Sequence, residues 1–251
     1  MRVLLFLLTG LLTWSACSSP EEAQSANVAI RFSHNWENTP VSAADFNILK
    51  FTNDNGEMLS IERLRYLISN VILTNLDNET YELSPYQLVN LGDEEVSIES
   101  TQVPAGDYKL SFVFGFTDTE NIDGGYPDLN TASFNVPAML GGGYHFMQFD
   151  GKYTAQNLPP AGFNYHVISA VNTADPNNLI FQDTSFKVDL GVVSISATTE
   201  IEIKMNIAEW FKNPNTWDLN VLNTVLMPNF DAQILMHQNG KSVFSLGTVQ
   251  E

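Results

Sequence analysis

Alternation of apolar and polar side chains every second residue dominates the chain from about residue 28 onward. At the start of this region Val28, Ile30 and Phe32 fall on one face of an extended segment, and the residues between them fall on the other. Successive side chains of a β-strand point to opposite faces, so this period predicts strands buried on one side. Similar runs follow at residues 66–75, 87–91, 108–116, 144–151, 164–171, 181–189 and 199–207.

Turn-forming residues separate these runs, for example at residues 53–56 and 104–107. Short strands joined by such turns predict an all-β fold, most economically a single antiparallel β-sandwich. Helical periodicity is scarce, and only short helical turns are expected, at Ile61 to Leu64 and at Ile207 to Phe211. Because no repeat or linker divides residues 28–251, we expect one domain there.

The first 16 residues show the pattern of an export signal. Arg2 precedes an apolar run from Val3 to Leu12 that is too short to span a bilayer. Small residues then precede Cys17, the single cysteine of the chain, although Trp14 stands where a lipoprotein signal usually has leucine. This pattern predicts cleavage after residue 16 and lipidation of Cys17. The alternative is an ordinary cleaved signal with an incidental cysteine.

Residues 17–27 are expected to form a flexible tether, because they are mostly small, polar or acidic. Glu21 and Glu22 follow Cys17 closely, and such acidic residues resemble the surface-export signals of Bacteroidota lipoproteins. We therefore expect an outer-membrane lipoprotein, periplasmic or surface-exposed, that contacts the membrane through its lipid anchor.

Charge and cysteine content restrict the partners and the chemistry. Removal of residues 1–16 takes away Arg2 and no acid, which leaves 10 basic and 29 acidic side chains and a formal charge of −19. A surface of this charge argues against a nucleic-acid partner. Once Cys17 is lipidated no thiol remains, so metal ligands would have to be His, Met, Asp or Glu.

Common enzyme signatures are missing from the sequence, including nucleotide-binding glycine patterns, a nucleophile elbow and the His-Glu-x-x-His motif. The glycines at 141–143 lack the lysine and the helix of a phosphate loop, and we expect them to allow a sharp turn or close packing. A protein that is not an enzyme is therefore expected. Activity at an open metal position is the remaining enzymatic alternative.

Four histidines are the candidate metal ligands: His34, His145, His166 and His237. Imidazole binds copper and zinc, and neighbouring strands can bring single histidines together from distant segments. Met147 shares a face with His145 and would add a thioether suited to Cu(I). Each histidine taken alone is more simply explained by a structural hydrogen bond. A shared ion requires imidazoles within about 5 Å of one another.

Eight segments follow one another in a specific order over about residues 28–247. They read IRFSH at 30–34, FTNDNGE at 51–57, LRYLISNVIL at 64–73, VPAGDY at 103–108, LGGGYHFM at 140–147, FNYH at 163–166, IKMNI at 203–207 and NGKSVF at 239–244. Together they resemble the copper-binding MbnP-like domain family, which is related to MbnP and MopE and is common among lipoproteins and periplasmic proteins of Bacteroidota.

The resemblance implies a β-sandwich that binds copper. Carried over position by position, His34, His145 and His166 match the characteristic histidines of the family, whereas His237 has no counterpart. Family members that use an oxidised tryptophan, kynurenine, as a ligand often carry a tryptophan shortly before the Gly-Gly-Gly-Tyr segment, where this chain reads FNVP at 134–137. This departure argues against a kynurenine ligand and a modifying peroxidase partner.

The hypothesis from sequence is a lipid-anchored, extracytoplasmic metal-binding β-sandwich. Copper is the expected metal, held by His34, His145 and His166 with Met147 as a candidate fourth ligand; zinc, or no metal, is the alternative. The alternative function is a non-catalytic cell-surface module that binds glycan or protein and in which the histidines are structural.

Overall fold

The computed structural model describes residues 25–93, 96–154, 159–175 and 177–251. The expected signal peptide, Cys17 and most of the expected tether lie outside the described residues. Strand β1 (Ser25–Trp36) begins before the expected domain boundary at Val28. Because Ser25 and Ala26 pair with Pro104 and Val103, the end of the expected tether is part of a sheet.

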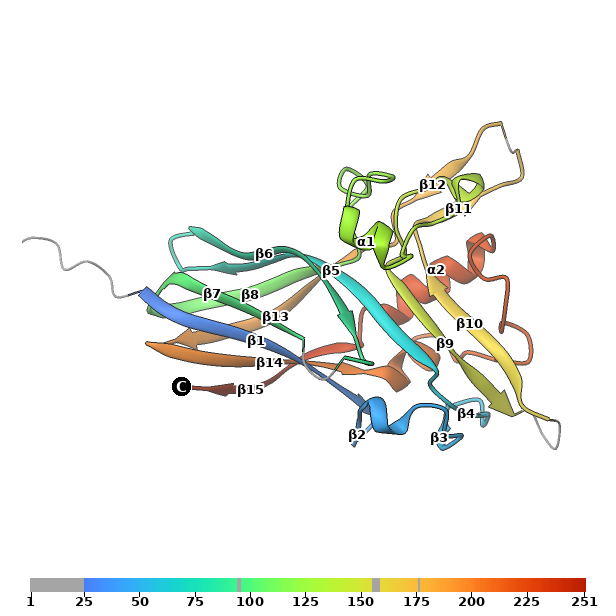
Figure 1. Ribbon diagram of the computed structural model, residues 1–251, viewed down its shortest axis with the longest axis horizontal. Helices are drawn as coiled ribbons and strands as arrows, with labels where there is room; N and C mark the ends of the chain where they lie inside the picture. The colour runs from blue at the N-terminus through green and yellow to red at the C-terminus, as the bar shows by residue number, and fades with distance from the viewer. Residues whose placement is uncertain (1–24, 94–95, 155–158, 176) are drawn as a thin grey trace, which may run out of the picture.

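Two β-sheets form most of the molecule (Figure 1). The remaining strands are β2 (Thr39–Val41), β3 (Phe51–Thr52), β4 (Met58–Leu59), β5 (Arg63–Thr74), β6 (Thr80–Asn90), β7 (Ser97–Pro104), β8 (Gly106–Phe114), β9 (Met147–Thr154), β10 (Ala161–Val167), β11 (Ala170–Asn172), β12 (Ile180–Gln182), β13 (Phe186–Ile195), β14 (Thr198–Asn206) and β15 (Phe244–Gln250). The helical segments are η1 (Ala43–Asp45), α1 (Pro127–Thr131), η2 (Ala138–Leu140), η3 (Ile207–Phe211) and α2 (Phe230–Gly240).

The five-stranded sheet has the order β15-β14-β1-β2, with β7 beside β1. The eight-stranded sheet has the order β13-β8-β5-β9-β4-β3, with β6 beside β5 and β10 beside β9. Figure 1 shows that β9 and β10 extend away from the end of the molecule where β1 begins, and that α2 lies beside them. The expected all-β sandwich is confirmed.

One strand pair departs from the expected antiparallel arrangement. Strands β1 and β14 run parallel, with Val28 opposite Thr199 and His34 opposite Met205. The two strands are far apart in sequence, so no hairpin turn dictates their relative direction.

A continuous hydrophobic core joins the two sheets. Alternate residues of β5, such as Leu64, Tyr66 and Ile68, are fully buried in it. Burial of each large apolar side chain stabilises the fold by roughly 1.5–3 kcal/mol. Arg63 and Arg65, which alternate with these residues, lie on the opposite face of the strand.

The short helical turns were predicted in part. The expected turn at Ile207 to Phe211 is confirmed as η3. The expected turn at Ile61 to Leu64 is wrong, because β5 begins at Arg63, which pairs with Asp150 of β9. Helix α2 was not predicted. No described helix is long and apolar enough to cross a membrane.

The backbone of Ser60 and the ring of Phe163 both pack closely against strand β9 at Gly151. A Cβ atom at Gly151 would lie 2.0 Å from the carbonyl oxygen of Ser60 and 2.7 Å from the ring of Phe163. Glycine at this position therefore allows the backbone beside β4 to approach β9.

Substitution of Gly151 by alanine should destabilise the protein by about 2 kcal/mol, because the backbone of Ser60 cannot move aside without disturbing β4 and β5. Urea unfolding would measure the change. Gly162→Ala in β10 is the matched control, since the nearest atom to its added Cβ is 4.0 Å away. Equal effects of the two substitutions would contradict this account.

Candidate metal centre

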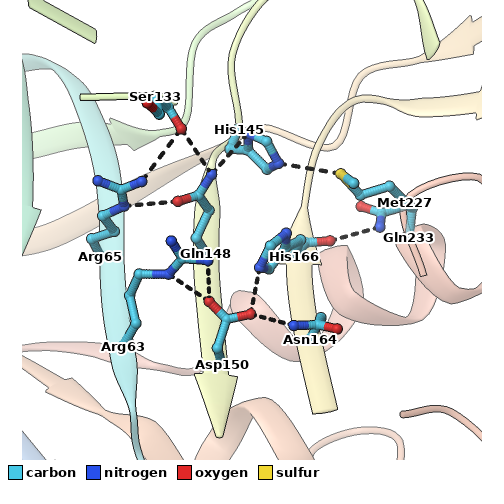
Figure 2. Close-up of polar contacts among 10 residues, drawn as sticks. All are labelled: Arg63, Arg65, Ser133, His145, Gln148, Asp150, Asn164, His166, Met227 and Gln233. Atoms are coloured by element: carbon cyan, nitrogen blue, oxygen red, sulfur yellow. Dashed lines mark hydrogen bonds and ion pairs between the residues drawn. The ribbon is translucent and has the colours of Figure 1, made fainter. Parts of the chain in front are cut away.

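Strands β9 and β10 carry a polar network on one face of the eight-stranded sheet (Figure 2). On the opposite face Tyr66 of β5 contacts His34 of β1, in the five-stranded sheet. In the antiparallel register of β9 and β10, His166 lies opposite Gln148 and Asn164 lies opposite Asp150. Because side chains alternate along a strand, these four side chains share one face. The register therefore determines which polar groups meet.

Asp150 fixes the orientation of His166. Its carboxylate accepts hydrogen bonds from Nε2 of His166 at 2.8 Å and from Nδ2 of Asn164 at 2.6 Å, and it forms an ion pair with Arg63. Burial alone would raise the pKa of Asp150, but the hydrogen bond and charge of His166, with Asn164 and Arg63, outweigh burial and lower this pKa to about 2. The acceptor is thus ionised, so Nε2 of His166 carries the hydrogen. In the neutral imidazole Nδ1 then holds a lone pair.

His145 is fixed in the opposite tautomer. Its Nδ1 lies 2.9 Å from the carbonyl oxygen of Phe134, which can only accept, so Nδ1 carries the hydrogen and Nε2 the lone pair. Burial lowers the pKa of His145 to about 4; the Phe134 hydrogen bond opposes this shift, and the charges of His166, Arg65 and Arg63 add to it. His145 is therefore a neutral imidazole at pH 7.

Arg65 and Gln148 brace the segment that carries Phe134. Nε of Arg65 donates to Oε1 of Gln148 at 2.7 Å. The Arg65 guanidinium and the Gln148 amide both donate to the carbonyl oxygen of Ser133, at 3.3 Å and 3.4 Å. These bonds hold the chain next to the carbonyl that orients His145.

Met227 completes the cluster. Its sulfur lies 3.2 Å from Nε2 of His145, and both atoms present lone pairs. The rings of His145 and His166 meet edge to face, with centroids 5.3 Å apart. In Figure 2 the second ring nitrogen of His166 lies on the side of the ring toward His145. Two imidazoles and a thioether therefore converge, and this donor set fits a soft metal ion.

Met227 lies in the loop between η3 and α2, and hydrogen bonds tie this loop to the two strands. The carbonyl oxygen of Asn223 accepts from the backbone N–H of Asn164 at 2.8 Å, and its side chain donates to the hydroxyl of Tyr153 at 2.8 Å. Sequence reasoning missed Met227 because it is far from both histidines in the chain and belongs to no periodic run.

The structure does not bring His34 and Met147 into this cluster. Met147 lies opposite Tyr66 in register and is fully buried in the core. His34 packs edge-on against the same Tyr66 ring, with centroids 5.7 Å apart. Tyr66 and its neighbour Arg65 point to opposite faces of the sheet, and Arg65 is on the face of the histidine pair.

Nor does His237 join the histidine pair, because it lies on α2 with its Nδ1 2.8 Å from the carbonyl oxygen of Thr184. Within the described parts of the chain, no three His, Cys, Asp or Glu side chains are grouped so that they could hold a metal ion. In the His145–His166 cluster the third donor is instead the thioether of Met227.

The fold and the cluster together define a class: a β-sandwich protein with two histidines and a methionine gathered on the outer face of one sheet. The chain belongs to the MbnP family, whose model matches residues 25–228. Among solved structures, MbnP from Methylosinus trichosporium superposes with a TM-score of 0.49 and 12% identity, over 74% of this chain and 77% of that one. No curated protein matches the chain.

His34 gives the fold a pH dependence of its own. Its Nε2 is buried without a hydrogen-bond partner among the described residues. Burial lowers the pKa of His34 to about 4, below its ordinary value of 6.5. Between these two values the unfolded chain binds more protons than the folded one, so the free energy of unfolding decreases as the pH falls.

Replacement of His34 by glutamine, which does not titrate, should remove this dependence. Between pH 7.5 and pH 5 the unfolding free energy of the wild type should fall by about 2 kcal/mol more than that of His34→Gln. Urea unfolding of metal-free protein at both pH values would measure this. Comparing changes with pH cancels any constant cost of the substitution and the contribution of His145. Parallel pH profiles would contradict the assignment.

Proposed function

We propose that this protein binds one copper ion through Nε2 of His145, Nδ1 of His166 and the sulfur of Met227. The observation that carries the proposal is the 3.2 Å approach of the Met227 sulfur to Nε2 of His145. Neither atom has a hydrogen to share, so a cation is the natural partner for both. A thioether beside imidazoles favours Cu(I) over the harder divalent ions.

The second nitrogen of each imidazole supports this assignment. One donates to the carbonyl of Phe134 and the other to the carboxylate of Asp150. Metal-binding histidines usually donate their other ring N–H to a carbonyl or carboxylate, which fixes the tautomer and orients the ring. Both rings therefore have the hydrogen-bond pattern of ligands before any ion binds.

Membership of the MbnP family is the second support for copper. Where the resemblance places a ligand-forming tryptophan, this chain has residues 134–137, and among them the ring of Phe134 lies with its centroid 5.6 Å from that of His145 and offers no donor atom. In our proposal Met227 takes the place of that third donor, and no kynurenine or modifying peroxidase is required.

The proposed setting is extracytoplasmic. Residues 1–16 act as an export signal, and lipidation of Cys17 anchors the domain at the outer membrane. We propose binding rather than catalysis, because the polar groups around the two histidines already hydrogen-bond to one another, with Asp150 holding Asn164 and Arg63.

Copper titration of the metal-free protein under reducing conditions, against a competing Cu(I) chelator, would test the site. We expect one Cu(I) per chain. His145→Ala and His166→Ala should each weaken binding by more than about 100-fold, and Asp150→Asn by about 10- to 100-fold, because Asp150 only orients a ligand. His237→Ala is the matched control. Stoichiometric binding unchanged in both ligand variants would contradict the site assignment, and absence of copper binding by the wild type would favour the alternative of an interaction module with structural histidines.

Met227→Leu tests the thioether separately. Leucine keeps the volume but not the sulfur, so Cu(I) affinity should fall at least about tenfold while the weaker affinity for Zn²⁺ stays nearly unchanged. Met139→Leu is the control, since Met139 is 79% exposed. Equal losses for both metals would show that Met227 packs against the histidines without acting as a ligand.

A further inference from the structure

A second polar cluster lies where the β3–β4 hairpin meets the loop between η3 and α2. Glu57, just before β4, is 3% exposed. Its Oε1 accepts hydrogen bonds from Nδ2 of Asn220 at 2.6 Å and from Nδ2 of Asn55 at 2.7 Å. Its Oε2 is buried and has no hydrogen-bond partner among the described residues. A buried carboxyl oxygen in this state is costly unless a proton or a cation reaches it.

Asp218 brings a second carboxyl group to the same place. Its Oδ1 accepts from the backbone N–H of Asn220 at 2.8 Å and from the Asn220 side chain at 2.9 Å. The pKa of Asp218 is lowered, chiefly by the hydrogen bond from the backbone of Asn220, which outweighs burial; hydrogen bonds with the side chains of Asn220 and Glu57 add to the shift. In the described part of the chain, no ion pair joins Glu57 or Asp218 to a basic side chain.

Neutral oxygen donors surround the two carboxyl groups. Asn53 anchors the hairpin turn, since its Oδ1 accepts the N–H of Glu57 at 2.9 Å and its Nδ2 donates to the carbonyl of Trp217 at 3.3 Å. The side-chain amides of Asn55 and Asn220 direct their nitrogen atoms toward the Glu57 carboxyl group. A half-turn of each amide exchanges its oxygen and nitrogen, so both can present oxygen to the same point.

We propose that this cluster is a calcium site, in which Glu57 and Asp218 supply carboxylate oxygens and Asn55 and Asn220 supply amide oxygens. Calcium takes oxygen ligands of these kinds in flexible geometry. The cluster offers neither imidazole nor thioether, so its chemistry differs from that of the His145 cluster. The site does not depend on copper, and each can fail without the other.

Calcium chloride added to protein freed of metal with EDTA would test this site, with binding measured by calorimetry and stability by the thermal unfolding midpoint. We expect one Ca²⁺ per chain with a Kd on the order of 10⁻⁴ M, the range of extracellular calcium modules, and a higher midpoint at millimolar calcium. Glu57→Gln and Asp218→Asn should each weaken binding at least tenfold and abolish the shift in midpoint. Magnesium should give a smaller shift, because it demands a stricter octahedral geometry.

Asp54→Asn is the matched control. It removes a negative charge from the same turn, but Asp54 is exposed, so calcium binding should persist. His145→Ala should also keep its calcium response, which separates this test from that of the copper site. Asp218 is only half-buried, so Asp218→Asn decides the outcome if Glu57→Gln does not fold. The proposal is overturned if calcium leaves the wild type unchanged, if both ligand variants respond like the wild type, or if Asp54→Asn loses binding as they do.

Discussion

The register between β9 and β10 is the constraint on which the histidine cluster depends. It places His166 and Asp150 on the outer face of the sheet while Phe149 and Tyr165, opposite one another, enter the core. A shift of one residue would exchange the two faces, and burial of the two rings opposes that shift. The same register therefore determines both the packing of the core and the placement of the polar network. Gly151 contributes to this placement, because the absence of a side chain allows the backbone of Ser60 to pack against β9.

Outside the sheet, a single backbone carbonyl determines the tautomer of His145. The carbonyl of Phe134 accepts a hydrogen bond from Nδ1 of His145, so this nitrogen carries the hydrogen. The carboxylate of Asp150 accepts from Nε2 of His166, so in that ring the other nitrogen, Nε2, is protonated. Arg65 and Gln148 hold the segment behind that carbonyl. Groups that would not themselves touch an ion therefore place the hydrogens on opposite nitrogens of the two rings.

Much of the fold could be predicted from sequence, because strand alternation records which face is buried. The alternation at Val28 predicted β1 correctly, but nothing local could show that β1 pairs in parallel with a strand far along the chain. For the site, family resemblance indicated His145 and His166, which do meet. It also grouped them with His34, which shares no face with them. Met227 escaped prediction because a loop residue leaves no periodic signal, and only the folded chain brings it to His145.

The three converging donors do not share the same mechanical support. His166 lies in β10 and His145 two residues before β9, whereas Met227 lies in the loop between η3 and α2, which Asn223 ties to β9 and β10 and in which Leu226 is buried. Loops open more readily than paired strands. Opening of the loop would withdraw the sulfur and leave both imidazoles in place. In the proposed copper site the thioether would therefore be the first ligand released, and a partner protein that bound this loop would receive the ion one ligand at a time.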